Sequence, residues 1–248
     1  AEAIKGTNLI QRIKMKSITK NDKIRIILLA VCIIVFLASG IYIINNKLQS
    51  IKNKNLSDEL AGLYDPDGTT DISVDGYPKD YIRGFEALYQ RNPDIAGWVK
   101  IPDTKLDYAV VQAEDNDKYH RADIDGKYND WGIPYVDFRV DQKKPSYNTV
   151  IYGHNWKNCR WNAAPSTYYA GQQMFESLLS YHHTSWAEQY PYLYYSTPNE
   201  EMAFVIFACF YTEGTDWYIN AEGNIDSVIS GAKSRSRHNF GVDVNSGD

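Results

Sequence analysis

An uncharged run from Ile26 to Ile44 is the feature that most limits what this chain can become. A helix rises about 1.5 Å per residue, so a run of this length can cross the hydrocarbon layer of a membrane, which is roughly 30 Å thick. The apolar core of a signal peptide is shorter. The sequence therefore predicts a transmembrane helix over residues 26–44.

Basic residues are unevenly distributed on the two sides of this run. More of them precede it than follow it (Lys5, Arg12, Lys14, Lys16, Lys20, Lys23 and Arg25 before; Lys47, Lys52 and Lys54 after). Because basic residues stay on the cytoplasmic side, we expect a single-pass protein with residues 1–25 in the cytoplasm and the remainder outside the cell membrane. A cleaved signal peptide is the alternative, but its basic segment would be unusually long and no A-x-A-like site follows.

The rest of the chain divides into a polar segment and a folded part. Residues 45–77 are rich in Asn, Lys, Asp, Ser and Gly, and a turn is expected at 65–68, so we predict a linker or stalk there. A domain is predicted over residues 78–248. The net charge of −5 gives no reason to expect a nucleic-acid partner.

Apolar patterning in the predicted domain indicates a mainly β fold. Residues 78–92 carry an apolar stripe at helical spacing, and further helices are expected near 174–179 and 225–232. Short apolar runs separated by turn residues predict strands, which lie at 98–101, 106–111, 133–138, 149–152, 192–195 and 203–211. Their length and spacing predict a closed or nearly closed β-barrel with flanking helices. The run 203–211 is apolar on both faces and is expected at the centre of the sheet.

The segment Asn148–Asn155 places a titratable side chain at the end of a predicted strand. Val150 and Ile151 are β-branched, and Gly153 gives the backbone freedom to turn before His154. A histidine in this position suits acid–base chemistry, and an ordinary structural histidine remains an equal alternative.

Other reactive side chains give weaker signals. His120 lies in a loop between strands, whereas surface positions are expected for three histidines (His182, His183 and His238). The three cysteines lack paired spacing; Cys209 lies in an apolar run, where a thiol is unreactive, and Cys159 lies in a polar loop. Without an H-E-x-x-H motif or a glycine-rich phosphate loop, no metal and no cofactor is expected.

Five segments in order resemble the class B sortases, which are membrane-anchored cysteine transpeptidases of Gram-positive bacteria. These segments are 92–99 (NPDIAGWV), 104–112 (TKLDYAVVQ), 115–119 (DNDKY), 132–139 (GIPYVDFR) and 148–155 (NTVIYGHN). The resemblance covers about residues 78–248 and implies a sortase-like β-barrel.

The resemblance also implies a reaction and its residues. A cysteine thiolate would attack the C-terminal sorting signal of a secreted protein, and an amine of the cell-wall peptide would resolve the acyl-enzyme. By its match, His154 would be the catalytic acid and base. The residues that match the substrate groove are Tyr152, Asn116, Tyr218 and Ile219. His120 stands where a leucine is common in the family. A pilin lysine or water are the alternative acceptors.

The chain departs from the family in two places. The family's cysteine lies in a T-L-x-T-C segment and its arginine on the following strand, and neither is present. We therefore expect that the chain stops before the catalytic cysteine and the last barrel strands and is inactive as it stands. Residues 159–171 look like an insertion beside the site. Two alternatives are a catalytically dead, membrane-tethered barrel that binds a peptide or a wall component, and an unrelated thiol hydrolase using Cys209 with His154.

Overall fold

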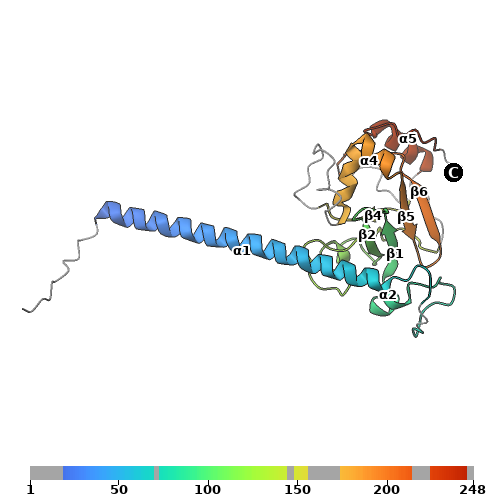
Figure 1. Cartoon of the computed structure of the whole chain (residues 1–248), viewed down its shortest axis with the longest axis horizontal. Coiled ribbons are helices and arrows are strands. Elements are labelled where there is room, and N and C mark those ends of the chain that lie inside the picture. Colours follow the sequence, from blue (N-terminus) through green and yellow to red (C-terminus); the bar gives the residue numbers. More distant parts are fainter. Residues whose placement is uncertain (1–18, 70–72, 144–147, 156–173, 214–223, 245–248) are drawn as a thin grey trace, which may run out of the picture. The chain divides into compact units, whose positions relative to one another are not determined.

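The computed structural model describes residues 19–69, 73–143, 148–155, 174–213 and 224–244. The chain separates into two compact units, residues 1–50 and residues 51–248. The helix α1, Lys20–Leu63, runs through the boundary between these units (Figure 1). Residues 25 and 44, where the anchor was expected to begin and end, both lie inside this helix.

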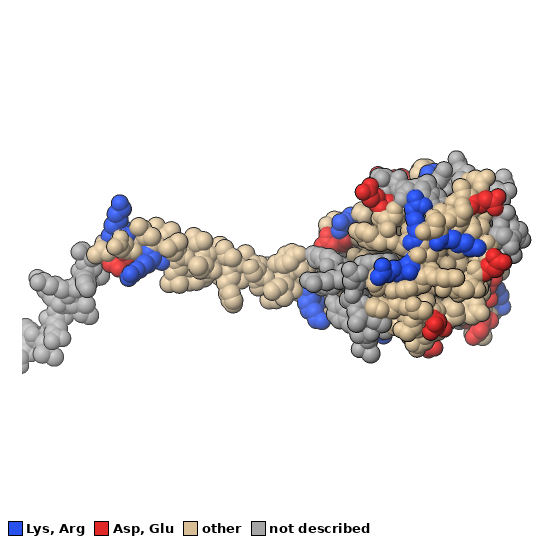
Figure 2. Space-filling model, turned by 90° about the horizontal axis from the view of Figure 1, so that it is seen from above, with Lys and Arg blue, Asp and Glu red and all other residues tan. Residues whose placement is uncertain are grey.

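In the first unit, α1 begins with reciprocal capping and continues as an apolar helix. The Asp22 backbone N–H donates to Thr19 Oγ1 at 3.2 Å, and the Thr19 backbone N–H donates to Asp22 Oδ2 at 3.1 Å. After Arg25 no charged side chain follows until Lys47, and the helix surface there is uniformly uncharged (Figure 2). Within the described residues, α1 is the one helix long and apolar enough to cross a membrane.

The end of α1 is part of the second unit. Leu60 is 4% exposed, and Leu56 and Leu63 pack against the same cluster of buried residues. Tyr64, just after the helix, stacks on Trp98 with ring centroids 4.7 Å apart. The spacing of the three leucines puts them on one face of the helix. The segment expected to be a linker thus contains helical residues that contribute to the core, ahead of residue 78.

Replacing Leu60 with alanine is expected to lower the free energy of unfolding by about 2–5 kcal/mol, because it leaves a cavity under α1. Urea unfolding of the full chain in detergent, followed by tryptophan fluorescence, measures this change. Ile51→Ala is the matched control, since Ile51 is 46% exposed on the same helix; it should cost less than about 1 kcal/mol. Equal effects of the two substitutions would show that the end of α1 is not docked.

Six strands form one curled sheet, a half-barrel within the described residues, in the order β4-β3-β2-β1-β5-β6. The strands are β1 Ile95–Lys100, β2 Asp107–Val111, β3 Tyr135–Val136, β4 Ile151–Tyr152, β5 Tyr192–Ser196 and β6 Glu201–Val205. Neighbouring strands are antiparallel except β2 and β3, which are parallel.

One strand prediction is wrong. Residues 203–211 were expected at the centre of the sheet, but among the described strands β6 is an edge strand and ends at Val205. Phe204 and Val205 are 46% and 43% exposed, whereas Met202 and Ile206 pack against a buried cluster. Local hydrophobicity indicated burial on both faces, but Phe204 and Val205, which are neighbours and point to opposite faces, are both exposed.

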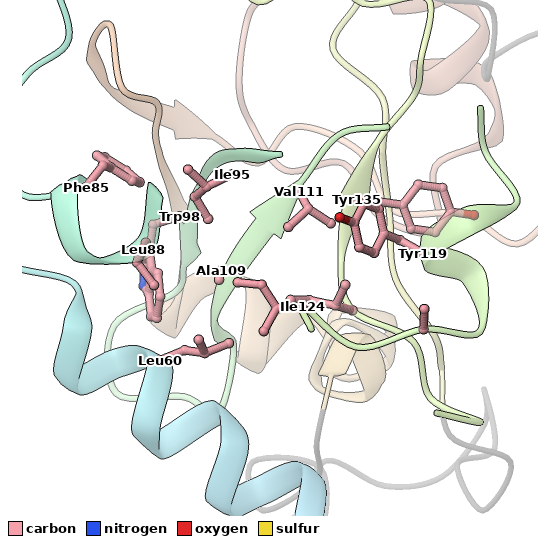
Figure 3. Packing of buried hydrophobic residues seen from close by; sticks show 12 residues of the cluster. Leu60, Phe85, Leu88, Ile95, Trp98, Ala109, Val111, Tyr119, Ile124 and Tyr135 are labelled. Atoms are coloured by element: carbon pink, nitrogen blue, oxygen red, sulfur yellow. The ribbon is translucent and has the colours of Figure 1, made fainter. Parts of the chain in front are cut away.

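Helical segments cover both faces of the sheet. On one face, α2 (Glu86–Arg91) and the end of α1 enclose a cluster that includes Trp98 and Ala109 (Figure 3). On the other face, η2 (Met174–His182) and α4 (Thr184–Gln189) contribute Tyr181 and Trp186. The other helices in the described segments are η1 (Lys118–His120) and α5 (Ile225–Arg235). The side chain of Asn224, the N-cap of α5, accepts from the Ser227 N–H. Alternate residues of each strand serve the two faces.

Candidate functional site

The sheet places His154 immediately after its edge strand β4. β4 pairs with β3 through Tyr135↔Tyr152 and Val136↔Ile151. Glycine is needed at position 153 because a Cβ there would lie 2.6 Å from the Phe175 ring. The sequence suggested instead that Gly153 allows a turn of the backbone, and its φ does not require glycine. The Phe175 N–H also donates to the His154 carbonyl at 3.2 Å, which fixes the backbone on both sides of the imidazole.

The His154 imidazole is oriented by a backbone carbonyl from another loop. His154 Nε2 lies 2.8 Å from the His120 carbonyl oxygen, so Nε2 carries a proton and donates it. In the neutral ring Nδ1 is then the proton acceptor. The two imidazole rings lie 4.6 Å apart between centroids. The structure therefore brings His120 beside His154, a pairing that the sequence pattern did not predict.

The surroundings favour the neutral form of His154. Burial is the largest influence and lowers its pKa below 6.5, and the electrostatic effects of His120 and Arg121 act in the same direction. The hydrogen bond to the His120 carbonyl and the charge of Asp130 oppose this shift only in part. At neutral pH the ring is thus available to accept a proton at Nδ1.

We expect the His154 imidazole to titrate with a midpoint below 6.5 in the folded protein. The unfolded chain binds this proton first as the pH falls, so His154 makes folding less favourable as the pH drops below its unfolded pKa. Histidine side-chain NMR of the full chain measures the midpoint, with the His154→Gln variant identifying the resonance. A midpoint above 6.5 would contradict the burial argument.

Two predicted groove residues, Asn116 and Tyr152, meet at a buried carboxylate. Tyr152 Oη donates to Asp137 Oδ2 at 2.8 Å, and Asn116 Nδ2 donates to the same oxygen at 3.1 Å. Arg139 binds both oxygens of Asp137 at 2.8 Å, through Nε and Nη2. Burial and the Asp137 charge raise the pKa of Tyr152 to about 12, so it remains a phenol. Asp137 and Arg139 were not singled out in the sequence, although both lie in the matching segment 132–139.

Of the other predicted groove residues and candidate nucleophiles, Cys209 alone lies in the described part of the chain. Tyr218, Ile219, Cys159 and the segment 159–171 lie outside the described residues. Cys209 is partly buried against the cluster that contains Tyr181 and Trp186, and burial raises the pKa of its thiol to about 11. A thiol in this state is a poor nucleophile, so the hydrolase alternative based on Cys209 loses support.

The remaining histidines form a separate cluster. His182 is 8% exposed, and its ring lies 5.1 Å from that of His183 and 6.4 Å from that of His238. The expectation of a surface position is therefore wrong for His182. Among the described residues, no group of three or more His, Cys, Asp or Glu side chains is arranged to hold a metal ion.

A cavity of about 600 Å³ lies elsewhere on the sheet, between β1, β5, β6 and the segment after α1. Tyr64, Trp98 and Glu201 are among its lining residues, and none of the predicted site residues is. The site built from the sequence is therefore the edge of β4 with the loops that support it.

The chain is similar to sortase B proteins both in sequence and in fold. The chain is 27% identical over 218 residues to a sortase B of Listeria monocytogenes, covering 86% of this chain and 82% of that protein. It resembles the crystal structure of sortase B from Bacillus anthracis in complex with AAEK1, with 25% identity, a TM-score of 0.63 and coverage of 81% and 88%. A Staphylococcus aureus sortase B–substrate complex has the same fold, with a TM-score of 0.67, 22% identity and coverage of 81% and 86%. No family model matches the chain.

Proposed function

We propose that this chain, a class B sortase-like protein in sequence and fold, is a membrane-anchored cysteine transpeptidase whose catalytic acid and base is His154. The observation that carries the proposal is the state of His154 at the end of β4. Its Nε2–H is held by the His120 carbonyl at 2.8 Å, and burial keeps the ring neutral. A fixed, neutral imidazole beside a sheet edge suits proton transfer to and from an amine.

The proposed reaction has two acyl-transfer steps. A cysteine thiol gives its proton to neutral His154 and attacks the backbone carbonyl of a sorting signal as a thiolate, and the scissile C–N bond breaks as His154 passes that proton on to the leaving amine. The incoming amine of a wall peptide then attacks the thioester and loses a proton to neutral His154. An arginine stabilises the oxyanion in both steps. The resemblance assigns the thiolate to a T-L-x-T-C segment, which residues 1–248 do not contain.

A secreted protein bearing a sorting signal is the proposed substrate. The S. aureus relative has been crystallised as a substrate complex, which supports a peptide groove in this chain. We assign the groove to Tyr152, Asn116, Tyr218 and Ile219. Asn116 donates an amide proton and Tyr152 its hydroxyl proton to Asp137, so Tyr152 would contact a peptide through its ring.

The anchor is proposed to be residues 26–44 of α1, with the N-terminus in the cytoplasm and the catalytic domain outside. The exposed apolar surface of this segment and the excess of basic residues before it support this topology. Deleting residues 26–44 should move the protein from the membrane fraction to the soluble fraction after cell lysis. Retention in the membrane fraction would contradict the assignment.

A transfer assay on the product of the complete reading frame tests the activity. The protein is incubated with a library of sorting-signal peptides and an amine acceptor, and mass spectrometry follows the joined product and the thioester intermediate. We expect both species. Peptide binding without either species would support the dead-barrel alternative, and a reading frame without a T-L-x-T-C segment would exclude the cysteine mechanism.

A further inference from the structure

The carboxylate of Asp137 lies at the junction of three segments next to the proposed site. The residue is fully buried, at 0% exposure, directly after β3. Its Oδ1 accepts from the Arg139 backbone N–H at 2.9 Å and from Arg139 Nε at 2.8 Å. Its Oδ2 accepts from Arg139 Nη2, Tyr152 Oη and Asn116 Nδ2. A buried charge is costly unless it is paired, and this one is fully hydrogen-bonded.

The turn that carries Asp137 is itself held from two sides. Gln112 Nε2, just after β2, donates to the carbonyls of Asp137 at 2.9 Å and Val140 at 2.7 Å. The Asp137 backbone N–H donates to the Val150 carbonyl at 2.9 Å, and the Phe138 N–H donates to Asn116 Oδ1 at 3.1 Å. These hydrogen bonds hold the Asp137 carboxylate in one position, so a side chain that binds it is also held in place.

The strand β4 is short and is held in place by few backbone hydrogen bonds. It has two residues, and its partner β3 also has two, so few ladder hydrogen bonds hold the strand that leads to His154. Tyr152 is the last residue of β4 and lies two positions before His154. Among the described contacts, the Tyr152 hydroxyl bond to Asp137 and the bond from His154 Nε2 to the His120 carbonyl are two side-chain hydrogen bonds that hold the segment 151–154.

We infer that Asp137 is a positioning residue for His154, acting through Tyr152, an inference that rests on the proposed function. Asp137 exchanges no proton in the reaction. Burial alone would raise the pKa of its carboxyl, but the hydrogen bonds from Arg139, Tyr152 and Asn116 outweigh burial and hold that pKa well below 3.8. Its role is to keep the end of β4 at one place, so that the imidazole meets the reacting amine in a productive geometry.

Tyr152→Phe removes the hydroxyl bond to Asp137 while leaving Asp137 bound to Arg139 and Asn116. Tyr135→Phe is the matched control, because Tyr135 faces Tyr152 on β3 with ring centroids 5.1 Å apart and makes no hydrogen bond to Asp137 among the described contacts. The first readout is histidine side-chain NMR of the full-length protein without substrate. We expect one Nε2–H tautomer of His154 in the parent and in Tyr135→Phe, and a tautomer mixture in Tyr152→Phe.

The second readout is turnover. Tyr152→Phe should lower kcat about tenfold or more with KM changed by less than about threefold, since misplaced catalytic groups can cost up to about 10² in rate. Asp137→Asn should act in the same direction if it folds. A His154 tautomer unchanged in Tyr152→Phe, equal effects of both Tyr→Phe changes, or an unchanged kcat in an active protein would each overturn the inference. If the parent protein has no activity, the proposed function fails and the NMR comparison still decides whether Asp137 positions His154.

Discussion

Replacing His154 with glutamine is expected to lower kcat for transfer of a sorting-signal peptide about 10²–10⁴-fold, the usual contribution of a general acid and base. Glutamine keeps a polar side chain that can donate to the His120 carbonyl, which His154 Nε2 now binds at 2.8 Å. It cannot accept and return a proton. The loss should therefore lie in kcat, measured at saturating peptide by chromatography of the product.

His183→Gln is the control for this substitution. His183 precedes α4 and lies in the separate histidine cluster with His182 and His238. The same change of residue type there should leave kcat within about twofold of the parent. A His154→Gln enzyme that retains more than about a third of the parental kcat would remove His154 from the mechanism, and equal losses in both variants would point to a general effect on folding.

Replacing Gly132 with alanine is expected to lower the free energy of unfolding by about 2–5 kcal/mol, from a left-handed backbone and a steric clash together. Its φ is +57°, and an added Cβ would lie 2.4 Å from the Tyr119 carbonyl oxygen and 2.7 Å from the His120 carbonyl oxygen. The second oxygen is the acceptor for His154. Thermal unfolding and the His154 NMR signal should therefore change together.

Gly126→Ala separates the two contributions. Gly126 has a similar φ of +73°, but nothing lies within 4 Å of an added Cβ. This variant should cost only the backbone strain, about 1–2 kcal/mol, and should leave the His154 signal unchanged. If the two alanine variants are equally destabilised, the contact with the His120 carbonyl is not the reason for glycine at position 132.

Local pattern predicted the central strands well. The runs 98–101 and 106–111 fall within or beside β1 and β2, and the helix expected near 225–232 is α5. The two strands have apolar residues that pack on both faces of the sheet. The central position predicted for residues 203–211 was wrong because hydrophobicity does not reveal strand order. Strand order depends on contacts between residues far apart in the chain. Leu56, Leu60 and Leu63 lie in a segment of polar composition, and they pack against the core only because the folded sheet provides a surface for them.

The site could be predicted only in part for the same reason. His154 was found because it follows an apolar run that ends in Gly153, a signal contained in neighbouring residues. The role of Asp137 depends on donors that come from positions 116, 139 and 152, which no local spacing connects. The acceptor for His154 is a backbone carbonyl, and every residue type has one, so the residue type at position 120 carries no information about it.

Acid tolerance follows from the way Asp137 is bound. Its carboxyl has a lower pKa in the folded chain than its unfolded value of 3.8, so its stabilisation is complete above that value and is lost only as the pH falls through the lower folded one. During acidification His154 therefore gains its charge while the Asp137–Arg139 pair remains intact. His154 then adds one positive charge beside β4 while the hydrogen bonds of Asp137 remain. This charge repels an incoming ammonium group. If the proposed transfer reaction holds, mild acid should reversibly slow the attack by the amine acceptor before it unfolds the protein.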